Sequence, residues 1–305
     1  MGAEMAIREL TQTLDGDSTD AKVVAVLALP DDATAATAAL KAALEGADPM
    51  LEVVLLDALY RLNRDPHVEE RLIAILDSPA AQGDGGEELY MMARIALNRV
   101  LADDGDAVSG ESSAVVAEAV LGVEPGGLVK LAVIVHGTWA RDGAWWRSQG
   151  DFHTYLKAKC GVDHLYDGDE PFIWSGRNRD QARSDAADAF GRWVIRHDPE
   201  ELEVYAHSHG ANVAMLSTHL GLEIDKLVMM SPPVRKDYFA QWDRVGEAFN
   251  IQSKFDPVVG IARGGRWFEL GGRVRELELD VRGHSVSHDP DVWEQFKVPE
   301  FVGLR

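Results

Sequence analysis

The chain has 305 residues, of which 46% are hydrophobic, and its formal net charge at pH 7 is −21. This length exceeds that of most single domains and provides ample apolar material for a core. An acidic surface repels nucleic-acid phosphates and anionic lipid headgroups, which disfavours both as partners, and the absence of a run of 18 uncharged apolar residues argues against an integral membrane protein.

The amino terminus and the cysteine content bear on the cellular compartment. The first residues lack a basic segment followed by an apolar one, so we expect no cleaved export signal. Cys160 is the single cysteine, which excludes an internal disulfide and fits a reducing compartment. We interpret Cys160 as a buried structural thiol and expect a cytoplasmic protein.

The acidic charge is concentrated in the first part of the chain. Residues 1–125 contain 24 acidic and 8 basic side chains, whereas residues 126–305 contain 27 and 22. A polar segment at 103–110 and the helix breaker Glu124-Pro-Gly-Gly127 lie close to this change. We therefore predict an acidic helical region over 1–125 and a second domain over 126–305.

The acidic region has the pattern of short amphipathic helices beyond residue 30, whereas residues 1–30 are ambiguous. Helices are expected at 33–44, 49–62, 66–76 and 87–101, with 113–121 as a further candidate. Asp31 or Asp32 is placed to cap the first of these helices. Asp-Pro pairs suit helix starts because Asp caps and Pro fits the first helical position.

Stacked helices with two Asp-Pro starts resemble HEAT-type repeats. This resemblance implies a protein-binding or substrate-shaping module within residues 31–121. The alternative is a plain helical extension that packs on the second domain.

From residue 131 onward, apolar runs alternate with amphipathic stretches. The expected strands are 131–135, 171–174, 202–206, 226–230, 248–253 and 275–281. The expected helices are 152–159, 179–197, 210–220 and 236–245. This alternation predicts an α/β fold with a doubly wound, mostly parallel sheet, preceded by an all-α domain. In such sheets, functional residues gather at the carboxyl ends of the strands.

Four expected strands end in residues that suit acyl transfer. They are followed, in chain order, by His136-Gly137-Thr138, Ser208, Asp256 and His284. Acyl transfer through a serine needs a hydroxyl, a base, a carboxylate that orients the base, and N–H donors for the oxyanion. The segment Ala206-His-Ser-His-Gly210 lies between a strand and a helix, as in the G-x-S-x-G nucleophile elbow, with Ala in place of the first Gly.

These motifs, in this order, resemble the α/β-hydrolase superfamily over residues 128 to 298. The resemblance implies that Ser208 is the nucleophile, His284 the base and Asp256 the orienting acid. It also implies that the backbone N–H groups of Thr138 and His209 bind the oxyanion. The expected activity is that of a serine hydrolase, carboxylesterase-like or lipase-like, which acts on a small-molecule acyl substrate without a cofactor.

His288 is an alternative base, four residues beyond His284. We favour His284 because it directly follows the strand, whereas His288 adjoins the Asp289-Pro290 helix start. His207, His209 and His219 are interpreted as structural histidines because no Cys or carboxylate cluster completes a metal site with them.

Four tryptophans lie near the ends of the first two expected strands. Trp139, Trp145 and Trp146 follow the first strand, and Trp174 ends the second. Large aromatic side chains near a strand-end cleft suit an apolar acyl pocket. The alternative is that they pack in the core or under a lid.

Two further functions would use the same residues differently. An acyltransferase would pass the acyl group from Ser208 to an alcohol instead of water. A non-catalytic protein would use the hydrolase fold as a scaffold, with the acidic helical region as a protein-binding module.

Overall fold

The structure, a computed structural model, describes residues 9–29, 33–83, 86–103, 129–234, 238–262, 270–271 and 273–304. The chain divides into two compact units, Met1–Val120 with Gly260–Trp267 and Leu121–Val259 with Phe268–Arg305. The predicted boundary near residue 125, the candidate helix 113–121 and the capping residues Asp31 and Asp32 lie outside the described residues.

The elements described within residues 9–103 are all helical. They are α2 (Thr19–Leu27), η1 (Thr34–Ala36), α3 (Thr37–Ala43), α4 (Pro49–Asn63), α5 (Val68–Leu76), α6 (Pro79–Gln82) and α7 (Glu87–Asp103). The Asp48 carboxylate caps α4 as the Asp-Pro pattern predicts, accepting hydrogen bonds from Met50 N and Leu51 N at 3.1 Å each. Asp65 does not cap α5, which begins at Val68, because its carboxylate is bonded instead to His67 N and Lys41.

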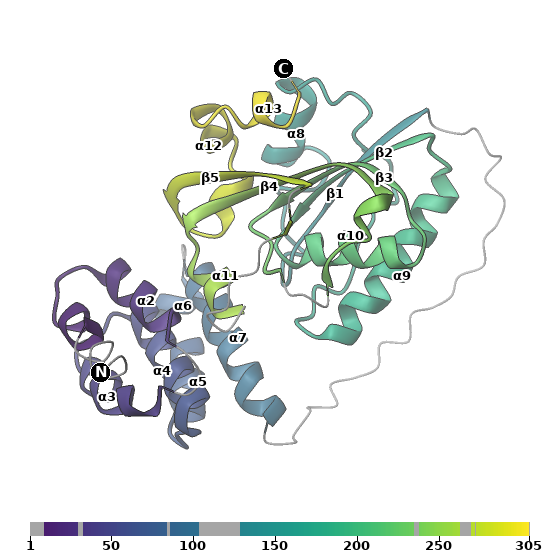
Figure 1. Ribbon diagram of the computed structural model, residues 1–305. Coiled ribbons are helices and arrows are strands. Elements are labelled where there is room, and N and C mark those ends of the chain that lie inside the picture. Colours follow the sequence, from purple (N-terminus) through teal and green to yellow (C-terminus); the bar gives the residue numbers. More distant parts are fainter. Residues whose placement is uncertain are drawn as a thin grey trace. The chain divides into compact units, whose positions relative to one another are not determined.

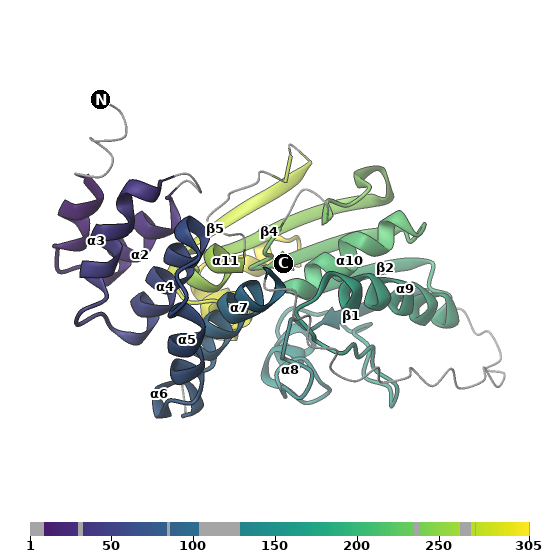
Figure 2. The same cartoon turned by 90° about the horizontal axis from the view of Figure 1, so that it is seen from below.

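Helix α4 is the centre of the helical unit, and it contacts α2, α3, α5 and α7 (Figure 2). Its Leu55 and Leu59 side chains are fully buried. Asp57 on the same helix is also buried and forms ion pairs with Arg61, at 3.2 Å, and with Arg99. A buried carboxylate requires such partners, and the two arginines supply them inside an otherwise apolar core.

The second unit contains a five-stranded parallel sheet with helices. Its strands lie in chain order: β1 (Lys130–Val135), β2 (Glu201–His207), β3 (Ile224–Met230), β4 (Val245–Phe255) and β5 (Val274–Arg282). Five of the six predicted strands are therefore present. Because every neighbouring pair is parallel, the carboxyl ends of all five strands share one edge of the sheet.

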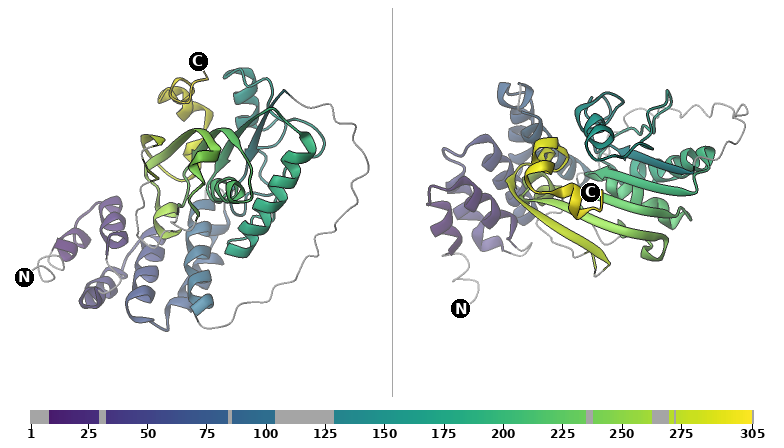
Figure 3. Two further views of the ribbon diagram at one scale, coloured as in Figure 1. Left: turned by 45° about the vertical axis from the view of Figure 1, so that its right-hand side comes forward. Right: turned by 90° about the horizontal axis from the view of Figure 1, so that it is seen from above.

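Helices cover both faces of this sheet (Figure 1, Figure 3). One face packs against α9 (Asp180–His197) and α10 (His209–His219). The other packs against α8 (Asp151–Ala158), α12 (Pro290–Gln295) and α13 (Val298–Phe301). With both faces covered, β1 carries the continuous apolar run from which it was predicted.

Two predicted elements are wrong. Residues 171–174 form no strand; instead Leu165 bridges to Ala132 at the edge of β1. Pro171 has no N–H to donate, and the Trp174 indole donates to the carbonyl of His136 at 2.8 Å, which places this segment in side-chain packing.

The predicted helix 236–245 is not formed over its described residues, 238–245; residues 236 and 237 lie outside the described residues. Tyr238 has 3-10 geometry, residues 239–241 are irregular, and the short helix η3 (Trp242–Arg244) precedes β4. The backbone of this segment bonds to side chains of α10 instead. Gln241 N donates to the Thr218 hydroxyl at 2.8 Å, and His219 Nε2 donates to the Phe239 carbonyl at 2.6 Å. These tertiary bonds replace the bonds of a helix.

The close approach of α10 to β1 generates the first prediction. A Cβ atom at Gly210 would lie 2.4 Å from the Val135 carbonyl oxygen and 2.6 Å from that of His136. We expect Gly210→Ala to lower the free energy of unfolding by about 1–3 kcal/mol or more, because backbone must move.

The matched control is Gly191→Ala in α9, where an added Cβ meets no atom within 4 Å. There the substitution should stabilise the protein by about 0.5–1 kcal/mol through helix propensity. Urea unfolding of both variants measures the difference, and equal stabilities would contradict the crowding at Gly210.

Candidate active site

Ser208 lies on the turn between β2 and α10. Its backbone has φ 53° and ψ −130°, a conformation that costs a non-glycine residue about 1–3 kcal/mol. The turn is held from both sides, because Ser208 N donates to the Met230 carbonyl at 2.8 Å and Ala211 N donates to the Ser208 carbonyl at 3.0 Å. This is the geometry expected of a nucleophile elbow.

The turn after β1 lies directly beside the elbow. A Cβ at Gly137 would come within 2.8 Å of the Ser208 Cβ, so only glycine fits there without displacement. Thr138 Oγ1 and His209 Nδ1 are hydrogen-bonded at 2.9 Å, which ties the turn to the first residue of α10. The backbone N–H of Thr138 makes no hydrogen bond with any residue that the structure describes. The two predicted oxyanion donors therefore lie on segments that are bonded to each other.

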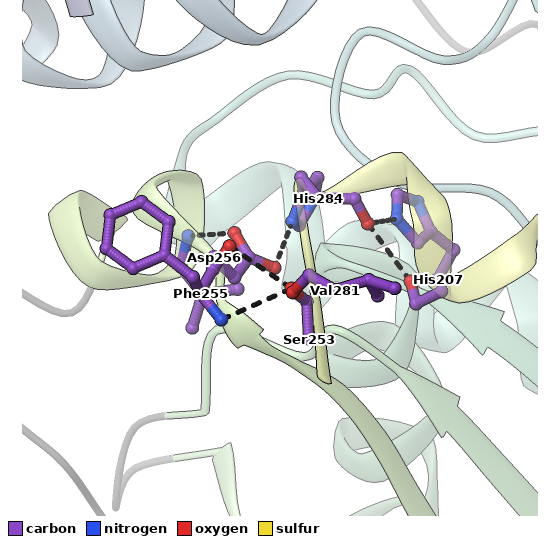
Figure 4. A network of polar contacts seen from close by, with 8 residues as sticks. His207, Ser253, Phe255, Asp256, Val281 and His284 are labelled. Atoms are coloured by element: carbon purple, nitrogen blue, oxygen red, sulfur yellow. Dashed lines mark hydrogen bonds and ion pairs between the residues drawn. The ribbon is translucent and has the colours of Figure 1, made fainter. Parts of the chain in front are cut away.

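Asp256 and His284, the predicted orienting acid and base, are in direct contact (Figure 4). The distance from His284 Nδ1 to Asp256 Oδ2 is 2.8 Å, and both side chains are buried. The other carboxylate oxygen accepts a hydrogen bond from Val259 N at 2.9 Å. Gly283 N donates to the Phe255 carbonyl at 3.0 Å, so backbone bonding also joins the two loops.

Ser253 supports this pair, and the sequence analysis did not single it out. Its hydroxyl donates to the Val281 carbonyl at 2.6 Å and accepts a hydrogen bond from Phe255 N at 3.3 Å (Figure 4). The register between β4 and β5 shifts at this point. The sequence does contain a signal for this role, because Ser253 is a hydroxyl residue near the end of a strand and lies three positions before Asp256.

The structure pairs Asp256 with His284 and not with His288. The His288 ring is stacked on Trp145 at 3.9 Å between ring centroids, and burial lowers its pKa to about 4. It therefore packs as a neutral aromatic group beside the site.

Ser208 and His284 are not hydrogen-bonded to each other. No hydrogen bond joins the Ser208 hydroxyl to either imidazole in the described part of the chain. The His284 ring is nevertheless 4.6 Å, between centroids, from the ring of His207, the neighbour of Ser208. In free enzymes such catalytic hydrogen bonds are often long and tighten on substrate binding.

The four tryptophans separate into two pairs. Trp146 and Trp174 are buried, and their indole rings stack on His136 at centroid distances of 4.8 Å and 5.7 Å. They belong to the core, which is the alternative that the sequence left open. Trp139 and Trp145 are partly exposed, so the pocket interpretation is kept for these two.

Three histidines near the site have structural contacts. His136 is fully buried between the two indoles, and His207 and His209 bond to neighbouring loops.

Among the residues described, no group of three or more His, Cys, Asp or Glu side chains could hold a metal ion. Within the same residues, no helix has the length and apolar character that crossing a membrane requires.

No protein-family model matches this chain, and no curated protein matches it significantly. Among solved structures, an uncharacterized protein from Bacillus cereus ATCC 10987 is similar with a TM-score of 0.34 and 13% sequence identity. The match covers 88% of this chain and 92% of that chain. A likeness at this level carries no argument, so the interpretation of the site rests on its own geometry.

The buried histidines predict a loss of stability in acid. Burial lowers the pKa of His136 to about 4, and the nearby charge of Arg147 acts in the same direction. The unfolded chain, with a histidine pKa of about 6.5, binds this proton more readily. Stability is therefore complete above pH 6.5 and declines as the pH falls toward 4.

At about pH 5, His136 alone should lower the free energy of unfolding by about 2 kcal/mol relative to neutral pH. Urea unfolding of the wild type and of His136→Asn at both pH values measures the contribution of His136 to this change in the free energy of unfolding. We expect the variant to show a smaller change with pH. An identical change in both proteins would contradict a neutral, buried His136.

Proposed function

We propose that this protein is a serine hydrolase that cleaves a carboxylic ester, or a related acyl bond, through an acyl-enzyme on Ser208. The observation that carries the proposal is the buried 2.8 Å contact between Asp256 and His284 at the sheet edge where Ser208 occupies its left-handed turn. A carboxylate that orients an imidazole close to a serine on a strand-to-helix turn is the arrangement that acyl transfer requires.

In the proposed reaction, Ser208 Oγ attacks the substrate carbonyl carbon while His284 Nε2 takes the hydroxyl proton. Asp256 holds the imidazole by Nδ1 and stabilises its positive charge. The N–H groups of Thr138 and His209 stabilise the oxyanion, and the loss of one such donor typically costs about 10²–10³ in kcat.

The intermediate then collapses, and the His284 proton passes to the departing alcohol. A water molecule gives a proton to His284 and attacks the acyl carbon. The bond between this carbon and Ser208 Oγ then breaks, and His284 passes the proton to Oγ, which releases the carboxylic acid and restores the hydroxyl.

The proposal includes an α/β-hydrolase-like organisation of the second unit. The strand order and the positions of Ser208, Asp256 and His284 after β2, β4 and β5 support it. Trp139 and Trp145 are the proposed contacts for a small acyl substrate. An accessory all-α domain and a cytoplasmic location complete this proposal.

A fluorophosphonate probe tests the nucleophile, because it reacts covalently with an activated serine. We expect the wild type to be labelled at neutral pH and Ser208→Ala to remain unlabelled. Ser184→Ala is the matched control, since Ser184 is exposed on α9, and it should be labelled like the wild type. An unlabelled wild type, or a labelled Ser208→Ala, would contradict the proposal.

Hydrolysis of p-nitrophenyl esters with increasing acyl length tests the substrate class. His284→Ala and Asp256→Asn should lower kcat by at least about 10³-fold and 10²-fold, because they remove the base and its orientation. His288→Ala should retain most of the activity. If it lost as much as His284→Ala, the assignment of the base would be wrong.

A further inference from the structure

His207 is the last residue of β2 and the direct neighbour of Ser208. Its side chain is buried, and its ring lies 4.6 Å from the rings of both His284 and His288 and 5.5 Å from that of Trp145, between centroids. The proposed reaction gives it no role. A buried histidine at the nucleophile that takes no part in the chemistry needs another explanation.

His207 forms a hydrogen bond with the backbone of the base. The distance from His207 Nε2 to the His284 carbonyl oxygen is 3.3 Å (Figure 4). A carbonyl only accepts hydrogen bonds, so Nε2 carries the proton. Burial, together with the neighbouring imidazoles, lowers the pKa of His207, which keeps the ring neutral. The ring is therefore present as the Nε2–H tautomer.

The backbone of His284 is held by bonds from separate elements. Its carbonyl also accepts a hydrogen bond from the Ser287 hydroxyl at 3.0 Å, and the preceding residue, Gly283, bonds to the Phe255 carbonyl. These two bonds fix the loop relative to itself and to β4. Of these backbone bonds, the one from His207 comes from the strand that carries the nucleophile.

This bond shortens the structural path between nucleophile and base. Residues 207 and 208 are adjacent in the chain, so one side-chain hydrogen bond joins the Ser208 turn to the His284 backbone. Asp256, by contrast, sets the orientation of the ring but bonds to nothing on β2. The bond from His207 therefore links β2 directly to the backbone of His284.

We propose that His207 is a positioning residue that sets the distance between Ser208 and His284 by donating its Nε2 hydrogen to the His284 carbonyl. The inference rests on the proposed function of the site. It differs from simple core packing, because an apolar ring of similar size would fill the same space without donating a hydrogen bond.

Two amide substitutions separate the bond from the packing. In His207→Gln the amide nitrogen lies about as far from the backbone as Nε2, whereas in His207→Asn it lies about where Nδ1 does. We expect the Asn variant, and likewise His207→Leu, to lower kcat and the labelling rate by about 10–100-fold with KM nearly unchanged. The Gln variant should recover most of this loss.

His219→Asn is the matched control. His219 Nε2 donates to the Phe239 carbonyl at 2.6 Å, so this variant removes the same type of bond from the same chain, on the exposed end of α10. It should leave kcat and labelling unchanged. Thermal unfolding of every variant shows whether a loss of activity reflects loss of the fold.

A second readout does not depend on turnover. The proton between His284 Nδ1 and Asp256 gives a far-downfield proton NMR signal when it is protected from exchange. This signal should persist in the wild type and in His207→Gln, and it should broaden or disappear in His207→Asn.

The outcomes separate the two proposals. A folded His207→Asn that is labelled and hydrolyses esters at the wild-type rate would overturn the role of His207 and leave the serine hydrolase intact. An unlabelled wild type would overturn the hydrolase, and the NMR signal would then decide the positioning role alone. An unchanged signal in His207→Asn would overturn it.

Discussion

The site depends on how closely the backbone of α10 approaches the end of β1. The space beside Gly210 is limited by the carbonyl oxygens of Val135, the last residue of β1, and of His136, and the space beside Gly137 by the Ser208 Cβ. At this separation the chain must pass from β2 into α10 within one residue, which places Ser208 in a left-handed conformation. The strain is confined to that residue, because the ladder bond to Met230 and the packed helix hold it on either side.

At the carboxyl ends of the strands, side-chain hydrogen bonds join one element to another. Asp256 with His284 joins the ends of β4 and β5, Thr138 with His209 joins the turn after β1 to α10, and His207 reaches the loop after β5. Hydrogen bonds in a buried, low-dielectric environment are strong, and each fixes one loop against another. The result is an edge of the sheet at which several loops are held against one another.

Burial also divides the histidines by their chemistry. The pKa values of His136, His207 and His288 are lowered by burial, so these rings are neutral and serve as packing or donor groups. His284 differs from them because its Nδ1 atom is hydrogen-bonded to the Asp256 carboxylate. The same fold therefore keeps several imidazoles near Ser208, and one of them has a carboxylate partner.

The sequence by itself determined the local elements and the order of the reactive residues. The Asp48 cap, the apolar run of β1 and the small residues around Ser208 act on neighbours in the chain, so their effect is visible without coordinates. Because parallel strands end at one edge, the meeting of Asp256 with His284 was also predictable.

Only the tertiary structure decided the remaining assignments. Three features depend on residues far apart in the sequence: the contact of Asp256 with His284, the core positions of Trp146 and Trp174, and the bond from His207. The two elements that were wrong, at 171–174 and 236–245, failed for the same reason. In the first segment, the Trp174 indole bonds to the His136 carbonyl, and in the second, Gln241 N bonds to the Thr218 hydroxyl of α10. Local periodicity does not reveal such tertiary hydrogen bonds.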